Sequence, residues 1–236
     1  MNIIFYIKHL YYLPQYLPVC NALLERHQDC TLLFEQGSLN SDVIHQSVDH
    51  DHYCSVIVDN SDAALQYIIE SSADWVFFGE AWNAIDQLPS SIKTALLYHG
   101  IGIKSSYYHS SLNTMSIRFV ESQFRKNELN RLHGTLPLEV TGFAKLDPLF
   151  KNNMMNNKIK NNNGALDPNK KTLLYAPTFY PSSIERMKKD WPNDFKEFNI
   201  IIKPHFFSLT SKKCKKHQQR IQYWSQYPNV FLVPVE

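Results

Sequence analysis

Residues 94–104 read Thr-Ala-Leu-Leu-Tyr-His-Gly-Ile-Gly-Ile-Lys, an apolar run that ends on the imidazole of His99 and continues through Gly100 to Lys104. A short apolar run of this kind predicts a buried strand. In α/β sheets, ligands lie outside the carboxyl ends of the strands. The segment therefore predicts a strand end that presents a base and a cation to an anionic ligand.

A second segment of the same kind occurs in the other half of the chain. The apolar run from Asn199 to Ile202 leads into Lys203, Pro204 and His205. Another strand is thus expected to deliver a lysine and a histidine at its carboxyl end. Two such histidines in different halves of one chain predict a cleft between two domains.

Similar apolar runs occur before and after these segments in the chain, and most of them are separated by stretches long enough to form a helix. They are Ile3–Ile7, Thr31–Phe34, Ser55–Val58, Trp75–Phe78, Ile117–Val120, Thr172–Tyr175 and Val230–Val233. This alternation predicts an α/β fold with a mainly parallel sheet and helices on its faces. The first helix is expected to begin at Pro18, where a first-turn proline is tolerated.

Composition divides the chain into two parts. Asparagine and lysine dominate residues 151–164, which makes this stretch the best linker candidate. We expect a Rossmann-like N-terminal domain over residues 1–164 and the start of a second Rossmann-like domain over residues 165–236. The second domain is expected to be incomplete, because a domain of this kind usually needs about 100 residues or more.

Charge and cysteine usage narrow the class of protein. The formal net charge of +2 is too near balance to indicate nucleic-acid binding. The four cysteines form no CxxC pair, so neither a zinc site nor a disulfide framework is predicted, and a reducing cytoplasm is expected. No apolar stretch approaches the length of a membrane span. A soluble or peripheral protein is expected.

Two polar clusters each allow two interpretations. The histidines and aspartates of residues 49–52, with His45, could bind a metal, but a solvated polar loop is favoured because their spacing is irregular. A basic run could meet anionic lipid headgroups or an anionic polymer, or could be an exposed helix face. This run consists of Lys212, Lys213, Lys215, Lys216 and Arg220.

Two further strand-end segments add polar candidates. Thr141 and Gly142 are followed by Lys145 and Asp147, and the run that ends at Tyr175 is followed by Ala176-Pro177-Thr178. Tyrosines 11, 12 and 16 could line an acceptor site after the first strand, although burial against the next helix is favoured.

In this order, the segments resemble the CDP-glycerol glycerophosphotransferases, a family that includes teichoic acid primases and polymerases. Residues 99–104 match its HGxxxK element and residues 175–178 its YAPT element. Residues 141–147 match its TGxPRxD element, with Ala144 and Lys145 in place of the proline and arginine. His205 corresponds to the strand-end histidine of the family's second domain.

The resemblance implies a GT-B fold and transfer of glycerol phosphate from CDP-glycerol to a hydroxyl of a lipid-linked or polymeric acceptor, with release of CMP. It implies catalytic roles for His99, as general base, and for His205, at the donor diphosphate. The segments supply the expected substrate-binding residues Gly100, Lys104, Thr141, Gly142, Lys145, Asp147, Pro177, Thr178 and Lys203. The family's Asp-Tyr-Ser-Ser donor segment would lie beyond Glu236.

The resemblance further implies a cytoplasmic enzyme, peripheral on the inner face of the membrane, that needs no metal or cofactor. Two alternatives remain open. One is a GT-B glycosyltransferase or epimerase that uses a nucleotide sugar. The other is a non-catalytic module that binds a nucleotide or an anionic polymer.

Overall fold

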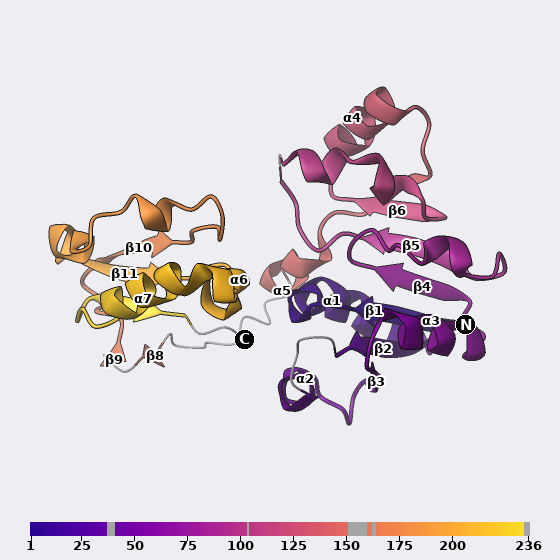
Figure 1. The fold of residues 1–236 in the computed structure, drawn as a ribbon, viewed down its shortest axis with the longest axis horizontal. Helices are drawn as coiled ribbons and strands as arrows, with labels where there is room; N and C mark the ends of the chain where they lie inside the picture. Colours follow the sequence, from indigo (N-terminus) through magenta and orange to yellow (C-terminus); the bar gives the residue numbers. More distant parts are fainter. Residues whose placement is uncertain (37–40, 103, 151–159, 162–163, 234–236) are drawn as a thin grey trace. The chain divides into compact units, whose positions relative to one another are not determined.

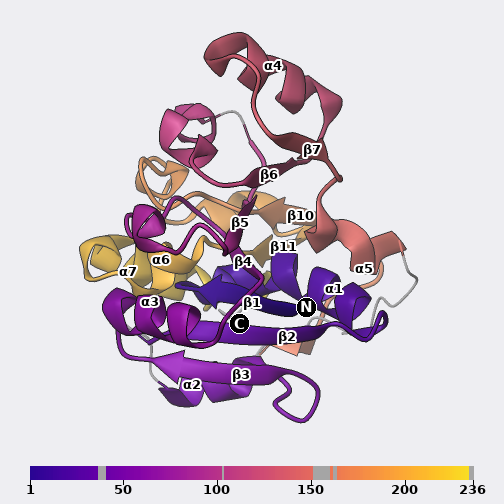
Figure 2. The same ribbon diagram turned by 90° about the vertical axis from the view of Figure 1, so that its right-hand side faces the viewer.

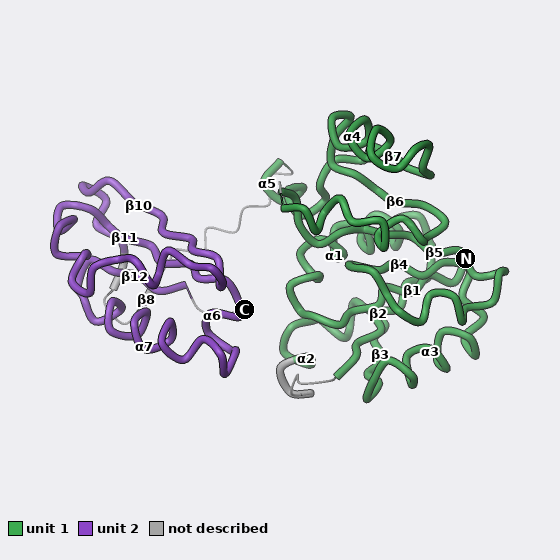
Figure 3. The backbone as a smooth tube through the Cα atoms, turned by 45° about the horizontal axis from the view of Figure 1, so that its top comes forward, with its two compact units in different colours: residues 1–154 green, residues 155–236 purple. Residues whose placement is uncertain are grey.

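The computed structural model describes residues 1–36, 41–102, 104–150, 160–161 and 164–233. The chain forms two compact units, residues 1–154 and 155–236 (Figure 3). Most of the predicted linker, residues 151–159 and 162–163, lies outside the described residues. The predicted domain boundary at residues 164/165 stays a prediction.

Unit 1 contains a seven-stranded sheet in the order β3-β2-β1-β4-β5-β6-β7, visible from bottom to top in Figure 2. All its strand pairs are parallel. The strands are β1 (Asn2–Ile7), β2 (Asp29–Glu35), β3 (Cys54–Val58), β4 (Trp75–Phe78), β5 (Lys93–Leu97), β6 (Ile117–Val120) and β7 (Leu138–Val140). The predicted parallel α/β architecture is confirmed. The strand order reverses between β1 and β4, the position where doubly wound sheets open a crevice.

Helices cover both faces of this sheet because its central strands are apolar on both sides (Figure 1). Phe5 and its odd-numbered neighbours in β1 pack with α1 (Leu13–Leu24) and α2 (Ser41–Ser47). Ile4 and Tyr6 point to the other face, where α3 (Ser61–Glu70) packs through Ala64 and Ile68. Side chains as fully buried as Phe5 and Ile4 each contribute about 1.5–3 kcal/mol.

The first helix begins earlier than the sequence predicts. A 3-10 turn at Leu10–Tyr12 leads directly into α1, and Pro14 rather than Pro18 occupies its first turn. Pro18 lies inside the helix, where a proline removes one backbone hydrogen bond. The buried stripe of Leu13, Tyr16 and Cys20 explains the early start, because it packs a further helical turn against the sheet.

The remaining helices of unit 1 connect or follow its last strands. They are α4 (Gln123–His133), which packs Leu129 against β6 and β7, and the short α5 (Asp147–Phe150). Single 3-10 turns lie at Ile85–Gln87, Ser105–Tyr108, Ser110–Asn113 and Ala144–Leu146.

Unit 2 contains a parallel three-stranded sheet in the order β10-β11-β12, with a separate antiparallel pair, β8 and β9. The strands are β8 (Lys160–Asn161), β9 (Gly164–Ala165), β10 (Lys171–Tyr175), β11 (Phe198–Ile202) and β12 (Val230–Leu232). Its helices are α6 (Phe206–Thr210) and α7 (Lys215–Trp224), with 3-10 turns at Ser183–Glu185, Trp191–Phe195 and Lys212–Cys214. Ile200 and Ile202 of β11 pack against Ile221 and Trp224 of α7. This is a second Rossmann-like arrangement, as predicted.

Candidate functional site

Three neighbouring strand ends of unit 1 meet where the strand order reverses. His9 follows β1, Gly79 and Glu80 follow β4, and His99 follows β5. Because β1, β4 and β5 are adjacent parallel strands, these residues share one edge of the sheet. Of His9, Gly79, Glu80 and His99, only His99 was predicted as a site residue from the sequence.

The hydrogen bond of the His99 ring determines which nitrogen can act as an acceptor. Nδ1 lies 2.8 Å from the carbonyl oxygen of Gly79, and a carbonyl can only accept, so Nδ1–H donates. The lone pair of the neutral ring is therefore on Nε2, and no described residue donates a hydrogen bond to this nitrogen. Burial lowers the pKa of His99 below its ordinary value, despite the opposing effect of the Gly79 carbonyl. His99 is thus a neutral imidazole with an available acceptor at Nε2.

Aromatic rings hold the His99 ring in place. Tyr12 stacks on it with 5.0 Å between ring centroids and 23° between planes, and Tyr11 meets it edge-on at 4.9 Å. Tyr12 is fully buried, whereas Tyr11 is half-buried. The predicted burial of the tyrosines is confirmed for Tyr12 and Tyr16, and Tyr11 remains at the rim of the site. Burial raises the pKa of Tyr11 to about 12, so its hydroxyl stays protonated.

Gly79 allows this packing because it has no side chain. A Cβ placed on Gly79 would lie 2.7 Å from the nearest ring carbon of Tyr12, closer than real Cβ contacts come. The same residue supplies the carbonyl that orients His99. Gly79 is therefore a positioning residue that was not predicted from the sequence, although it directly follows a predicted strand.

A second imidazole lies beside the first. His9 stacks on Tyr11 at 4.9 Å and meets Tyr12 edge-on at 5.6 Å. Burial lowers the pKa of His9, with Glu80 acting in the opposite direction. Glu80 also forms a 3.7 Å ion pair with Lys8. The position of His9 directly after the first apolar run is the sequence signal that could have identified it.

The loop after β7 brings Lys145 to this site. Thr141 donates its N–H to the carbonyl of Val120 at 3.0 Å, and Gly142 has a positive φ of 81°, which favours glycine. Lys145 then donates its N–H to Oε1 of Gln15, a buried residue of α1, at 2.9 Å. The charge of Lys145 contributes to the lowered pKa of His99. The structure thus brings together Lys145 and His99, which lie far apart in the sequence.

Gly100 and Gly102, which follow His99, both lie beside Tyr107. A Cβ on Gly100 would lie 2.9 Å from the hydroxyl of Tyr107, so this glycine also permits a close approach. The buried Arg125 donates from Nη2 to the carbonyl of Gly102 and from Nε to Glu121 at 2.9 Å. Lys104 is exposed and has no described contact with His99.

The predicted residues of unit 2 lie at the ends of two adjacent strands. The N–H of His205 donates to the carbonyl of Pro177 at 3.2 Å, and that of Lys203 to the carbonyl of Tyr175 at 3.0 Å. Nδ1 of His205 accepts the N–H of Phe207 at 3.2 Å, so Nε2 of the neutral ring carries the hydrogen. His205 is therefore arranged as a donor, the opposite of His99. Lys203 and Thr178 are exposed beside it.

The histidine-rich loop and the basic run have ordinary contacts. His52 lies 3.3 Å from Oδ1 of Asn21, and His50 lies 2.6 Å from the hydroxyl of Ser55. The described part of the chain contains no group of three or more His, Cys, Asp or Glu that could hold a metal ion. The four lysines at 212–216 are exposed, whereas Arg220 donates to backbone carbonyls, including that of Met187 at 2.7 Å.

No helix within the described residues is long and apolar enough to cross a membrane.

No family model matches the chain, and no curated protein matches it. Solved structures do. MnaA from S. aureus with UDP superposes with a TM-score of 0.64 at 10% identity, over 99% of this chain and 68% of that chain. The UDP-GlcNAc 2-epimerase from Neisseria meningitidis bound to UDP-GlcNAc superposes with a TM-score of 0.57 at 14% identity, over 100% of this chain and 73% of that chain. The wall teichoic acid polymerase TagF with CDPG superposes with a TM-score of 0.53 at 15% identity, over 90% of this chain and 59% of that chain.

At these identities the likeness concerns the fold. The two units together have the GT-B-like α/β fold predicted from the sequence, which is shared by epimerases and by TagF. The predicted membership of the CDP-glycerol family stays a prediction, and the N. meningitidis epimerase superposes with a higher TM-score than TagF.

Proposed function

We propose that this chain is a GT-B transferase that moves glycerol phosphate from CDP-glycerol to a hydroxyl acceptor and releases CMP. The observation that carries the proposal is His99, whose Nδ1–H is fixed by the Gly79 carbonyl, which leaves Nε2 as an acceptor. The HGxxxK, TGxPRxD and YAPT resemblances favour this donor over a nucleotide sugar. TagF, which shares the fold, was solved with CDPG.

His99 acts on the acceptor. A polyol hydroxyl is a poor nucleophile, and Nε2 of His99 takes its proton as the oxygen attacks the phosphorus that bears glycerol. A lowered pKa keeps the imidazole neutral near neutral pH, which is the form a general base requires. General-base assistance of this kind contributes about 100- to 10,000-fold to the rate. Gly100, Thr141 and Gly142 are proposed to contact the substrate, whereas Asp147 lines a different part of unit 1, beside Asn21 of α1.

Lysine side chains and hydrogen-bond donors are proposed to stabilise the negative charge of the phosphates. The bond from phosphorus to the CMP oxygen breaks as the new bond to the acceptor oxygen forms, so negative charge moves onto CMP. Lys145 is proposed to stabilise the transferred phosphoryl group, together with Lys104. His205, with Nε2–H as donor, is proposed to act on the donor diphosphate with Lys203, Pro177 and Thr178.

The proposed acceptor is a lipid-linked or polymeric polyol phosphate or glycan. The exposed lysines at 212–216 are proposed to contact an anionic membrane surface, because they have no described ion-pair partners. Cytoplasmic location at the inner membrane face is part of the same proposal.

A second candidate is an epimerase or glycosyltransferase that uses a nucleotide sugar. It is favoured by the higher TM-scores of the proteins solved with UDP and with UDP-GlcNAc. In that case the Nε2 acceptor of His99 is proposed to take a proton from the sugar substrate or from its acceptor. Donor profiling separates the two candidates.

The test is CMP release from CDP-glycerol in the presence of an oligomeric polyol phosphate acceptor. We expect His99→Ala to lower turnover by about 100- to 10,000-fold. The matched control is His133→Ala, because His133 is an exposed histidine of the same unit whose Nε2 lies 2.6 Å from the backbone carbonyl oxygen of Tyr108. Undiminished turnover in His99→Ala would overturn the assignment. Turnover of UDP-GlcNAc without turnover of CDP-glycerol would favour the second candidate.

A further inference from the structure

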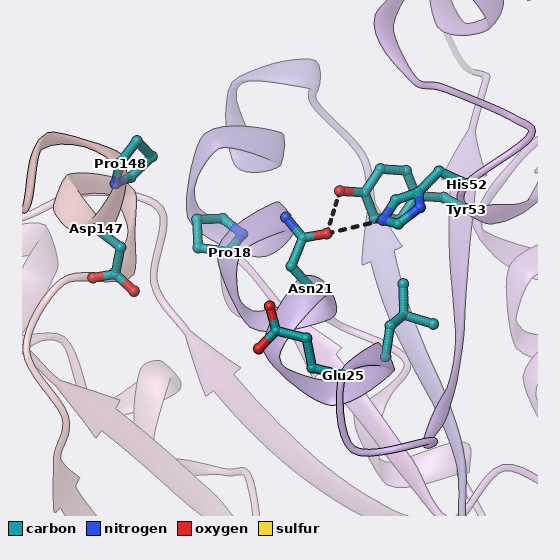
Figure 4. Close-up of a pocket in the computed structure, with 8 residues that line it drawn as sticks. Pro18, Asn21, Glu25, His52, Tyr53, Asp147 and Pro148 are labelled. Carbon is teal, nitrogen blue, oxygen red and sulfur yellow. Dashed lines mark hydrogen bonds between the residues drawn. The ribbon is translucent and has the colours of Figure 1, made fainter. Parts of the chain in front are cut away.

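A cavity of about 600 Å³ on unit 1 is lined by α1, by the residues before β3 and by the start of α5. Its floor is one face of α1, formed by Pro18, Asn21 and Glu25, which are spaced by three and four residues (Figure 4). His52 and Tyr53, which precede β3, form one wall. The other wall is the start of α5, with Asp147 and Pro148.

The polar groups of one wall are ordered by a single side chain. Oδ1 of Asn21 accepts from the hydroxyl of Tyr53 at 2.5 Å and lies 3.3 Å from Nε2 of His52. Because Oδ1 is used in this way, the amide nitrogen of Asn21 can donate to a ligand. The cavity thus offers a fixed donor, the Asn21 amide, beside the aromatic ring of Tyr53.

Two carboxylates line the same cavity. Glu25 is exposed at the end of α1, and Asp147 is half-buried at the start of α5. Neither carboxylate has a cationic partner among the described residues, and a carboxylate only accepts hydrogen bonds. The cavity therefore attracts hydroxyl and ammonium groups, and its charge repels phosphate.

The cavity is separate from the imidazole of His99. Tyr12, which stacks on His99, directly precedes α1, and Asn21 lies eight residues beyond the first residue of that helix, or about 12 Å at 1.5 Å per residue. The loop from Lys145 to Asp147 nevertheless reaches both places, since Lys145 bonds Gln15 and Asp147 lines the cavity. An anionic nucleotide donor does not suit this second place.

From this lining we infer a second binding site, in which a small polyhydroxylated ligand with an ammonium group, such as an amino sugar, is held between Glu25, Asp147 and Asn21. The ammonium group lies between the two carboxylates, and the hydroxyl groups accept from the Asn21 amide. The apolar edge of the ligand packs on Pro18 and the ring of Tyr53. This inference does not depend on the proposed transferase activity.

The experiment uses the full chain labelled with ¹⁵N and no nucleotide donor. Protonated glucosamine, glucose and glycerol phosphate are titrated separately, and the side-chain amide of Asn21 is followed by NMR. Because ion pairs at exposed sites contribute modestly, we expect glucosamine to bind about fivefold more tightly than glucose, with this preference weakening at high salt. Glycerol phosphate is expected to leave the Asn21 signal unchanged.

The matched variants are Glu25→Gln and Glu139→Gln, both isosteric and both at exposed positions. Glu25→Gln should reduce the preference for glucosamine to about twofold or less, while Glu139→Gln should retain about fivefold. The inference is overturned by an Asn21 signal that does not respond to glucosamine, by equal binding of glucose, or by an unchanged preference in Glu25→Gln. Activity on CDP-glycerol has no bearing on these outcomes.

Discussion

Replacing Gly79 by alanine tests the close packing of Gly79 on Tyr12, the aromatic ring that stacks on the imidazole of His99. The added Cβ would lie 2.7–2.9 Å from three ring carbons of Tyr12. Tyr12 is fully buried, so its ring has no solvent into which it can move. Overpacking of this kind costs typically about 1–3 kcal/mol, and we expect Gly79→Ala to lower the free energy of unfolding by that amount.

Gly102→Ala is the matched control for this substitution. A Cβ on Gly102 would meet the ring of Tyr107 at 3.6 Å, an ordinary contact, and Gly102 is not among the positive-φ residues. We expect a change within about 0.5 kcal/mol. Urea denaturation of the two variants, with the slope checked for constancy, measures the difference.

A double substitution identifies the cause. If the clash with Tyr12 is responsible, the cost of Gly79→Ala should fall to about 0.5 kcal/mol or less in a Tyr12→Ala background. Equal stability of Gly79→Ala and Gly102→Ala would refute the reasoning. An undiminished cost in the Tyr12→Ala background would refute it as well.

Four other substitutions probe charge and burial. Lys145→Ala should raise the pKa of His99, measured by NMR titration, because the lysine charge opposes protonation of the ring. Since the pKa of His99 is lower in the folded chain than in the unfolded chain, unfolding takes up protons, and stability should fall as pH drops below about 6.5. His99→Gln removes the titrating imidazole, so the free energy of unfolding of this variant should depend less on pH below about 6.5. Arg125→Met should cost about 3–5 kcal/mol in urea denaturation, because the half-buried Glu121 loses its partner. Asn199→Ala should destabilise unit 2 by about 1–3 kcal/mol in hydrogen exchange, since it leaves the backbone of Asp167 without its bonds.

The sheet could be predicted because its strands are apolar on both faces. Runs such as Ile3–Ile7 and Trp75–Phe78 stand out in sequence and coincide closely with β1 and β4. No apolar run in the sequence marks the short strand β7, because its central residue is Glu139 and it follows Pro137, although Thr141 and Gly142 were expected to follow a strand. The start of α1 was missed because Pro18 suggested a first turn, while burial of Tyr16 and Leu13 decided the outcome.

The candidate site was predictable only in part. Strand-end positions identified His99 and His205 without any contact being known. The partners of His99 were not visible, because Gly79, Tyr12 and Lys145 come from three other parts of the chain. Strand order alone brings β1, β4 and β5 side by side, and a sequence pattern does not specify that order. The predicted roles of Lys104 and of the residues around His205 stay predictions.

The protonation state of His99 is the most direct measure of the central claim that Nε2 is available as a base. A ¹⁵N-histidine-labelled sample, with His99→Gln to assign the signal, gives both the tautomer and the pKa from ring nitrogen shifts. We expect a neutral ring with hydrogen on Nδ1 and a pKa below the ordinary histidine value. A ring with hydrogen on Nε2, or a pKa at or above the ordinary value, would contradict it.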